Sequence, residues 1–263
     1  MTELSDQQLL RYSRQIFLPN IDVAGQQKLS DQCIIIMGAG GLGSLSSAYL
    51  AGAGVGKLVL VDDDVIDVTN LHRQLLYTEN DIGLKKVDIA AKRLASMNAD
   101  CEIEVIDSRL DVDQLQQLCV SADLLLDGTD NFSTRLLVNQ ACYVSKTPLI
   151  TAAVTQFSGQ LSTFDFAEGS PCYQCLYPDV DDVENNCTEN GVLGPNVGLM
   201  ASLQALHAIK FILGLPVESL HRLMVVDMLN GKQRNIALKS DVACLICGKK
   251  NRNNEKNRVF YGW

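Results

Sequence analysis

The sequence predicts an α/β protein built on a doubly wound sheet, and three observations lead to that fold class. Apolar segments of strand length alternate with segments of helix length between residues 33 and 144. A glycine-rich turn, residues 38–43, directly follows the first apolar segment. After residue 149 the alternation gives way to a hairpin pattern. We therefore expect a sheet that is parallel over most of its width and antiparallel at its far side.

The first elements of the chain are helices that precede the sheet. Ser5 can cap a helix that carries Leu9, Leu10 and Tyr12, and a second short helix is expected around residues 26–29. The sheet itself begins with the first apolar segment. From there the pattern predicts strands over residues 33–37, 58–61, 103–106 and 124–126, and helices over residues 42–53, 85–97, 113–119 and 131–144.

The later part of the chain has a different pattern. Residues 149–154 and 159–164 predict the two strands of the hairpin, with a glycine-containing turn between them. Residues 177–190 are rich in acidic residues and asparagine and lack periodicity, so we expect a mobile loop there. A helix over residues 197–213 presents a broad apolar face.

Length and composition limit the classes of protein that this chain could be. With 263 residues, 47% of them hydrophobic, it can bury a large core, and we expect a single domain over residues 1–248 and a polar tail over residues 249–263. The formal charge of −9 argues against a nucleic-acid partner. No long apolar run suggests a membrane span and the amino terminus does not resemble a secretory signal, so we expect a cytoplasmic protein.

Four of the nine cysteines form two matching Cys-x-x-Cys pairs, Cys172/Cys175 and Cys244/Cys247. Disulfides are disfavoured in a cytoplasmic chain, and four thiolates with no further ligand favour a closed, tetrahedral and structural zinc site. A single pair could be a dithiol redox centre, but two matching pairs make zinc the better interpretation. We therefore expect zinc to cross-link the C-terminal region to the segment around residues 172–175.

The glycine-rich turn is typical of a nucleotide site in a Rossmann-like sheet. Gly38, Gly40 and Gly43 allow a tight turn and let phosphates approach the backbone N–H groups at a helix start. The next strand ends in residues 62–64, three consecutive aspartates, where a carboxylate can accept both ribose hydroxyl hydrogens. The alternative for this acidic run is a surface turn, but motif and spacing together favour ribose binding.

The residues that follow distinguish ATP from a nicotinamide cofactor. Asn70, Arg73, Gln74 and Lys86 place two amides, one arginine and one lysine just beyond the ribose carboxylate. That composition suits a triphosphate and can stabilise charge that moves onto pyrophosphate, whereas nicotinamide cofactors need no such cluster. A dehydrogenase is therefore an alternative that only the glycine-rich turn supports.

A second polar turn, Asp127-Gly128-Thr129-Asp130-Asn131, closes the strand over residues 124–126. In doubly wound sheets, the loops that contact ligands follow the carboxyl ends of the strands. The carboxylates of this turn could therefore hold Mg²⁺ against phosphate oxygens. Asp130 could also cap the helix that follows, and the two roles are compatible.

Together these motifs resemble the MoeB and ThiF adenylyltransferases, which activate ubiquitin-like sulfur carriers and are homologous to the core of the ubiquitin E1 enzyme. The resemblance covers roughly residues 5–248 and includes both cysteine pairs. It implies that ATP reacts with the C-terminal Gly-Gly carboxylate of a carrier protein to give an acyl adenylate and pyrophosphate. It also implies that zinc binds the matching cysteines.

The resemblance further implies roles for individual residues of the nucleotide site. Asp130 would coordinate Mg²⁺ and be indispensable. Gly41 and its glycine neighbours would pack against the nucleotide, and Asp62 would hold the ribose. Arg73 and Lys86 would contact the triphosphate. The wall of the pocket would include Asn70, Gln74 and Asn131.

Three more residues bear on the resemblance. Arg14 matches an arginine that reaches the γ-phosphate bound to the partner subunit, which implies a homodimer; a surface helix arginine is the alternative. His72 stands where relatives have glutamine, and this change leaves the other assignments intact. Lys85 replaces a frequent proline, so either Lys85 or Lys86 could be the lysine that reaches phosphate.

The resemblance leaves the carrier and the role of Cys187 open. Cys187 lies where the thiamine branch has a cysteine that bonds with the carrier terminus during sulfur transfer, whereas the nearby cysteine of the molybdopterin branch is not required. Residues 1–14 and the cysteine register slightly favour the molybdopterin carrier, and residues 194–198 favour the thiamine carrier. Any sulfur donor is expected to be a separate protein. Adenylation of a tRNA base or a peptide terminus, and a nucleotide-sensing scaffold without turnover, are further alternatives.

Overall fold

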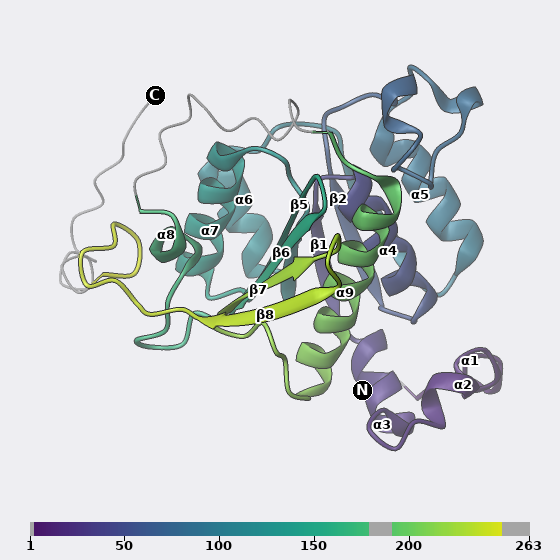
Figure 1. Cartoon of the computed structure of the whole chain (residues 1–263). Coiled ribbons are helices and arrows are strands. Elements are labelled where there is room, and N and C mark those ends of the chain that lie inside the picture. Colours follow the sequence, from purple (N-terminus) through teal and green to yellow (C-terminus); the bar gives the residue numbers. More distant parts are fainter. Residues whose placement is uncertain (1–2, 179–190, 249–263) are drawn as a thin grey trace.

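The computed structural model describes residues 3–178 and 191–248, and this part of the chain contains one mixed sheet of eight strands (Figure 1). The strands are β1 (Cys33–Met37), β2 (Lys57–Val61), β3 (Glu102–Ile106), β4 (Leu124–Asp127), β5 (Leu149–Thr155), β6 (Ser158–Phe164), β7 (Arg222–Asp227) and β8 (Lys232–Ala237). Their spatial order is β3-β2-β1-β4-β5-β6-β7-β8. The first five are parallel and the last three pair antiparallel, which confirms the predicted fold class.

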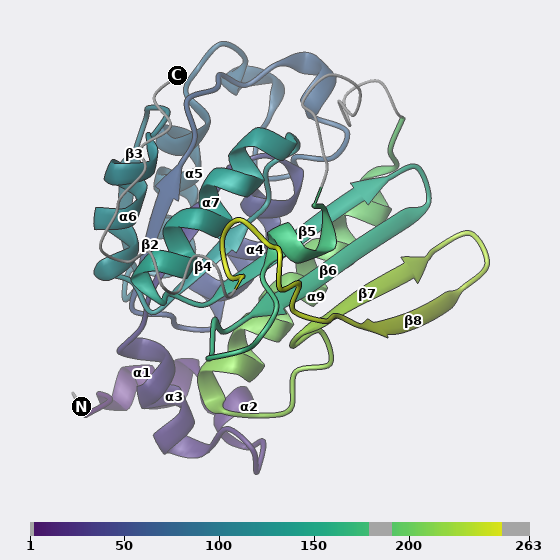
Figure 2. The ribbon, with the colours of Figure 1, turned by 90° about the vertical axis from the view of Figure 1, so that its left-hand side faces the viewer.

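Helices cover both faces of the sheet, as Figures 1 and 2 show from two sides. One face carries α4 (Gly41–Gly52), α5 (Lys86–Met97) and α9 (Gly194–Leu213), and the other carries α6 (Val112–Val120), α7 (Phe132–Ser145) and the short α8 (Tyr173–Leu176). Two 3₁₀ turns, η1 (Val68–Asn70) and η2 (Glu79–Asp81), lie between β2 and α5. The protein is therefore a three-layer α/β structure.

The central strands are buried on both faces, and successive residues enter different cores. Ile34 and Ile36 of β1 belong to the core under α4, α5 and α9, whereas Ile35 and Met37 belong to the core under α6 and α7. Parallel strands that are covered on both sides read as continuous apolar runs, and β1 has the sequence Cys-Ile-Ile-Ile-Met. This is why its bounds agree with the prediction.

The three N-terminal helices lie at the edge where the parallel strands begin (Figure 1). They are α1 (Asp6–Arg11), α2 (Ser13–Ile16) and α3 (Asp22–Ser30). Ser5 and Gln8 form a reciprocal capping box at α1, so the predicted cap is confirmed. The Arg11 guanidinium donates to the Met97 carbonyl oxygen, which docks this lobe on the last turn of α5.

Helix α9 is long and apolar enough to cross a membrane, with 20 residues and a mean hydropathy of 1.3, which differs from the expectation of no such segment. Half of that apolar window is buried inside the protein, where α9 packs on α4 and β5. A core helix between a sheet and a second helix meets the same criteria of length and composition. Of the apolar face that the sequence predicted, Val197 and Met200 are buried in this core, whereas Leu199 and Leu206 are exposed.

The prediction missed four short elements, α2, α8, β7 and β8. Every residue of β8 is exposed, so its side chains carry no hydrophobic pattern and the strand is defined by its pairing with β7. Helices α2 and α8 have four residues each, too few for a helical period. Most of the predicted loop, residues 179–190, and the tail, residues 249–263, lie outside the described residues.

Candidate active site

The site predicted from the sequence lies where β1 and β4 end side by side. These strands are neighbours in space, and the strand order reverses between them, which is where doubly wound sheets bind ligands. Gly38 has φ +87°, and a β-carbon on Gly43 would lie 1.8 Å from the Gly38 carbonyl oxygen. The turn therefore requires glycine at both positions. A β-carbon on Gly38 would also lie 3.4 Å from the backbone of Gly128, so the two polar turns are in contact.

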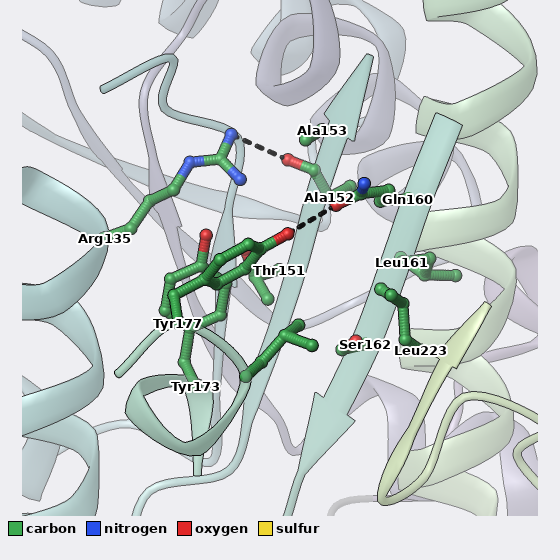
Figure 3. Close-up of a pocket in the computed structure, with 11 residues that line it drawn as sticks. Arg135, Thr151, Ala152, Ala153, Gln160, Leu161, Ser162, Tyr173, Tyr177 and Leu223 are labelled. Atoms are coloured by element: carbon green, nitrogen blue, oxygen red, sulfur yellow. Dashed lines mark hydrogen bonds between the residues drawn. The ribbon is translucent and has the colours of Figure 1, made fainter. Parts of the chain in front are cut away.

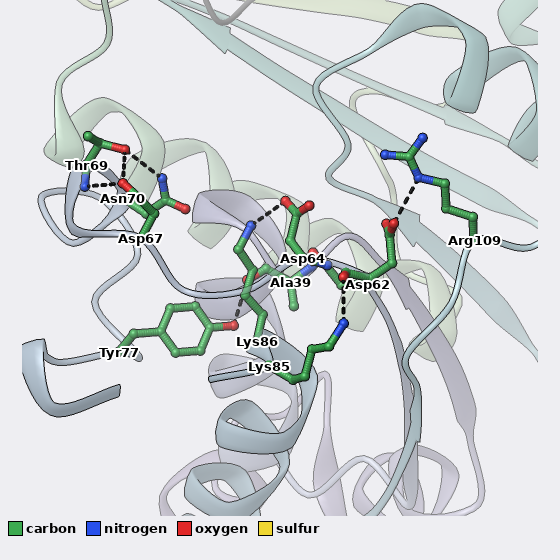
Figure 4. Close-up of polar contacts among 11 residues, drawn as sticks. Ala39, Asp62, Asp64, Asp67, Thr69, Asn70, Tyr77, Lys85, Lys86 and Arg109 are labelled. Atoms are coloured by element: carbon green, nitrogen blue, oxygen red, sulfur yellow. Dashed lines mark hydrogen bonds and ion pairs between the residues drawn. The ribbon is translucent and has the colours of Figure 1, made fainter. Parts of the chain in front are cut away.

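Asp62 closes the site at the end of β2 (Figure 4). Its carboxylate accepts the Ala39 N–H at 2.6 Å and the Asp64 N–H at 2.8 Å, which joins β2 to the glycine-rich turn. Burial raises the pKa of Asp62, and the positive charge of Lys86 opposes that shift. Asp62 is half-buried and Asp64 is exposed, so the surface-turn alternative fits Asp64 only.

The structure separates the two adjacent lysines. Lys86 is 6% exposed, and its Nζ lies 2.7 Å from an Asp64 carboxylate oxygen on the side of Asp62 and Tyr77. The Lys85 Nζ points away, to the Asp63 carbonyl oxygen at 3.1 Å and the Asp107 carboxylate at 3.0 Å. Lys86 is therefore the lysine of the pocket.

The segment with Asn70, Arg73 and Gln74 packs against the glycine-rich turn. The Asn70 carbonyl oxygen accepts the N–H groups of Arg73 and Gln74, both at 3.0 Å, so the three residues form one turn. A β-carbon on Gly41 would lie 3.5 Å from Arg73 and 2.7 Å from Val197, at the start of α9. Arg73 is half-buried and its Nη1 donates to the Thr69 carbonyl oxygen at 3.2 Å.

Gln74 carries a buried polar atom that the described residues leave without a partner. Its side chain is 3% exposed, and its Oε1 finds no hydrogen bond in the part of the chain that the structure describes. Its Nε2 would lie 3.6 Å from a β-carbon on Gly40. Because an unpaired buried oxygen is costly, a ligand that donates a hydrogen bond to this wall would relieve that cost.

The turn after β4 contains two aspartates with different environments. Asp127 is buried, and its carboxylate accepts the Thr129 N–H and hydroxyl and the Thr151 hydroxyl. Asp130 is exposed, and no donor or cation within residues 3–178 and 191–248 pairs with its carboxylate. Asp127 therefore shapes the turn, and Asp130 is the carboxylate available to a cation.

The proposed capping role of Asp130 is wrong. The N-cap of α7 is Asn131, whose side-chain oxygen accepts the Thr134 N–H at 2.9 Å. Its oxygen also accepts the Ser133 hydroxyl at 3.0 Å, which leaves the amide nitrogen of Asn131 for a nucleotide. Asn131 thus lies at the predicted place, with part of its side chain already engaged.

These residues fit the triphosphate of ATP and one divalent cation. Residues 40–43 offer backbone N–H groups at the start of α4, Lys86 and Arg73 supply positive charge, and Asp130 supplies an oxygen ligand of the kind that Mg²⁺ prefers. Such an arrangement can align a substrate and stabilise charge that develops on pyrophosphate.

The four cysteines of the two pairs come together on the α7 side of the sheet, between α8 and residues 244–247. Their sulfur atoms all lie within 4.8 Å of one another, with Cys172–Cys244 at 3.7 Å and Cys175–Cys247 at 3.2 Å. The Asp241 N–H donates to the Cys175 sulfur at 3.4 Å. Zinc–sulfur bonds of about 2.3 Å in a tetrahedron require sulfur separations near these values. The cluster can hold zinc.

Arg14 does not join the site in a single chain. Arg14 is exposed on α2, in the lobe that docks at Met97, whereas Lys86 begins the same helix α5 at the active-site end. A helix of this length separates its ends by roughly 18 Å. Cys187 lies outside the described residues.

Sequence reasoning missed two residues that support the site, Tyr77 and Arg135. The Tyr77 hydroxyl donates to the Ala39 carbonyl oxygen at 2.7 Å, and burial raises the pKa of Tyr77, which keeps this donor protonated. Arg135 is a buried residue of α7 beneath the Asp130 turn. For Arg135, the available signal was a charged residue on the apolar face of a predicted helix.

Comparisons with known proteins identify the family. A model of the ThiF family matches residues 12–246. The chain is 43% identical over 248 residues to the sulfur carrier protein ThiS adenylyltransferase of Escherichia coli K12, covering 94% of this chain and 98% of that protein. It is 39% identical over 249 residues to the molybdopterin-synthase adenylyltransferase of Salmonella typhimurium, covering 95% and 100%.

Solved structures with the same fold include the E. coli protein MccB with ATP, at a TM-score of 0.79 and 25% identity, covering 90% of this chain and 73% of that chain. The structure of MccB with MccA-N7isoASN gives a TM-score of 0.80 at 26% identity, covering 90% of this chain and 75% of that chain.

Proposed function

The chain belongs to the ThiF family and is an adenylyltransferase, and from that premise we propose that it activates the C-terminal glycine of a ubiquitin-like sulfur-carrier protein with ATP. The observation that carries this proposal is the set of charged residues around the glycine-rich turn after β1. Asp62 follows β2 and has the charge of Lys86 near it, and Asp130 lies in the turn after the neighbouring strand β4. A nicotinamide enzyme has no use for the lysine and the free carboxylate in that arrangement. The relatives that are named for ThiS and for molybdopterin synthase support the same reaction.

In the proposed reaction a carboxylate oxygen of the carrier attacks the α-phosphorus of ATP. The bond between that phosphorus and the bridging oxygen breaks, and pyrophosphate leaves with the electron pair. A carboxylate is already ionised at neutral pH, so no general base is needed, and the three histidines of the chain have no catalytic task. Catalysis then depends on alignment and on charge neutralisation.

Each residue of the site has one part in this proposal. Asp62 binds the ribose, while Lys86 and Arg73 neutralise charge on the triphosphate. The glycine-rich turn offers its N–H groups to the phosphates, with Asn70, Gln74 and Asn131 in the surrounding wall. Asp130 would hold Mg²⁺, which when bound supplies further positive charge to the leaving pyrophosphate.

Two carriers are candidates, the small subunit of molybdopterin synthase and a ThiS-type carrier of the thiamine pathway. Identities of 43% and 39% differ too little to choose between them. A peptide is a second candidate substrate, because the MccB structures that share the fold are named with the peptide MccA. A participation of Cys187 in sulfur transfer would accompany the thiamine carrier.

ATP–pyrophosphate exchange, with each carrier or a peptide supplied separately, tests the proposal. We expect exchange with one carrier ending in Gly-Gly, and none with that carrier when the Asp130→Ala variant replaces the natural enzyme. Exchange with the peptide alone would replace the carrier by a peptide substrate. Absence of exchange with all of them would refute the proposed reaction.

We also propose a homodimer in which Arg14 reaches the partner subunit's nucleotide, because Arg14 lies too far from the site of its own chain. Co-expression of Arg14→Ala with Asp130→Ala chains tests this. In a mixed dimer one shared site carries both changes and the other carries neither, so activity returns although each variant alone is inactive. If the mixture stays inactive although mixed dimers form, Arg14 does not act across subunits.

A further inference from the structure

Three polar residues follow one face of α7 at intervals of four. Asn131 caps the helix next to Asp130, Arg135 lies one turn further on, and Asn139 lies one turn beyond that. Residues four apart share a helix face, so the three form a line. Arg135 and Asn139 are buried within an otherwise apolar core. This line runs from the Asp130 turn to the cysteine cluster.

Arg135 holds the backbone of the turn that carries Asp130. Its Nη2 donates to the Thr129 carbonyl oxygen and, at 3.1 Å, to the carbonyl oxygen of Ala152 on β5 (Figure 3). The Tyr173 hydroxyl points toward the same guanidinium (Figure 3), and burial raises the pKa of Tyr173 while the positive charge of Arg135 opposes that rise. A planar guanidinium can serve several acceptors at fixed angles, which a lysine cannot do.

Thr129, the residue before Asp130, is held from both sides. Its N–H and hydroxyl donate to the Asp127 carboxylate at 3.0 and 2.7 Å, and its carbonyl oxygen accepts from Arg135. The Asp130 side chain has no contact of this kind within the described residues. The position of its carboxylate therefore depends on the backbone that Asp127 and Arg135 hold.

Asn139 connects the same face to the cysteine cluster. Its side-chain nitrogen donates to the Cys172 sulfur at 3.7 Å, and its side-chain oxygen accepts the Tyr173 N–H at 2.9 Å. Asn139 thus holds the Tyr173 backbone, and the Tyr173 side chain points toward Arg135. Through this tyrosine the cysteine region reaches the neighbourhood of the Arg135 guanidinium.

We propose that Arg135 is a positioning residue for adenylyl transfer, which sets the place of the Asp130 carboxylate through the Thr129 carbonyl, with Tyr173 as its support from the cysteine region. This inference rests on the Mg²⁺-binding role proposed for Asp130. Partners that orient a metal ligand change metal affinity or activity by about 10- to 100-fold when they are removed. A residue that only fills the core changes stability instead.

The test measures the Mg²⁺ concentration for half-maximal ATP–pyrophosphate exchange, with both Gly-Gly carriers present, together with the thermal midpoint of unfolding. Arg135→Lys keeps the positive charge but removes the planar guanidinium with its several N–H donors. Tyr173→Phe removes one hydroxyl and keeps the buried ring. Val138→Ala, a buried residue between Arg135 and Asn139 on α7, is the control for loss of packing.

We expect Arg135→Lys to raise the half-maximal Mg²⁺ concentration by about 10-fold or more, and Tyr173→Phe to raise it less. Val138→Ala should lower the thermal midpoint and leave the Mg²⁺ dependence unchanged. The inference is wrong if Arg135→Lys and Val138→Ala both change only the thermal midpoint while Asp130→Ala abolishes exchange. Natural activity in Asp130→Ala would instead refute the role of Asp130, and with it the proposed site.

Discussion

The half of the sheet from β1 to β5 and the half that contains β6–β8 with the cysteine cluster are held together in different ways. In the first half, the contacts of the site join neighbouring strands and their turns, as in the hydrogen bonds from Ala39 to Asp62 and from Thr151 to Asp127. In the second half, the cysteine pairs that meet are 72 residues apart. Changes in the first half should therefore affect activity most, and changes in the second half should affect stability most.

Removal of a cysteine ligand is the largest expected effect on stability. We expect Cys175→Ser to lose bound zinc and to destabilise the fold by about 5 kcal/mol, because loss of a structural metal is among the most destabilising changes known. Zinc content by mass spectrometry and thermal melting measure this. Cys33→Ser, outside the cluster, should keep the metal, and full zinc content in Cys175→Ser would contradict the four-cysteine site.

The two adjacent lysines test the active-site half. Lys86→Ala should lower the exchange rate by about 10²- to 10³-fold, because it removes a charge that faces the triphosphate. Lys85→Ala removes a lysine that contacts Asp107 and should stay within about threefold of the natural enzyme. Thermal melting of both variants checks that they fold. A larger loss of exchange in Lys85→Ala than in Lys86→Ala would reverse the assignment of the pocket.

The glycine-rich turn allows a comparison within one helix. In Gly43→Ala the added carbon would collide with the Gly38 carbonyl. We therefore expect the free energy of unfolding to fall by about 1–3 kcal/mol and ATP binding to weaken. Gly52→Ala, in the last turn of α4, meets no atom within 4 Å and should be neutral or slightly stabilising. Urea unfolding and ATP titration measure both effects, and equal stability of the two variants would contradict the described packing.

The smallest expected effect is a dependence of stability on pH that comes from His207, in the second half. Burial lowers the pKa of His207 below 6.5, against the opposing charge of Glu218. The unfolded chain therefore binds this proton first as the pH falls, so stability is full above about pH 6.5 and falls below it, by at most about 1.4 kcal/mol per pH unit. In His207→Gln the urea midpoint of unfolding should change less between about pH 7 and pH 5.5 than it does in the natural protein. An unchanged slope in that variant would assign the dependence to other groups.

The same contrast explains how much of the fold the sequence predicts. Strand β1 is predicted residue by residue because it is apolar on both faces and ends in glycine. Strand β8 is missed because all six of its residues are exposed and only pairing with β7 makes them a strand. Local sequence patterns thus predict buried strands such as β1, whereas an exposed strand such as β8 is defined only by its pairing with a distant part of the chain.

The site follows the same rule. Asp62, Lys86 and Asp130 could be predicted because each follows a strand or begins a helix at the active edge. The choice between Lys85 and Lys86 required the direction of each side chain, which neighbouring positions in the sequence do not determine. Arg135 was missed because its partners, Thr129, Ala152 and Tyr173, come from three separate segments.

The central claim is that the edge formed by β1, β2 and β4 adenylylates a carrier terminus, and intact-mass spectrometry of the carrier tests it most directly. After incubation with ATP and this protein, we predict that one Gly-Gly carrier gains the mass of a single AMP, and that the same carrier without its last glycine gains none. Equal modification of the truncated carrier, or an unmodified carrier in every case, would contradict the account.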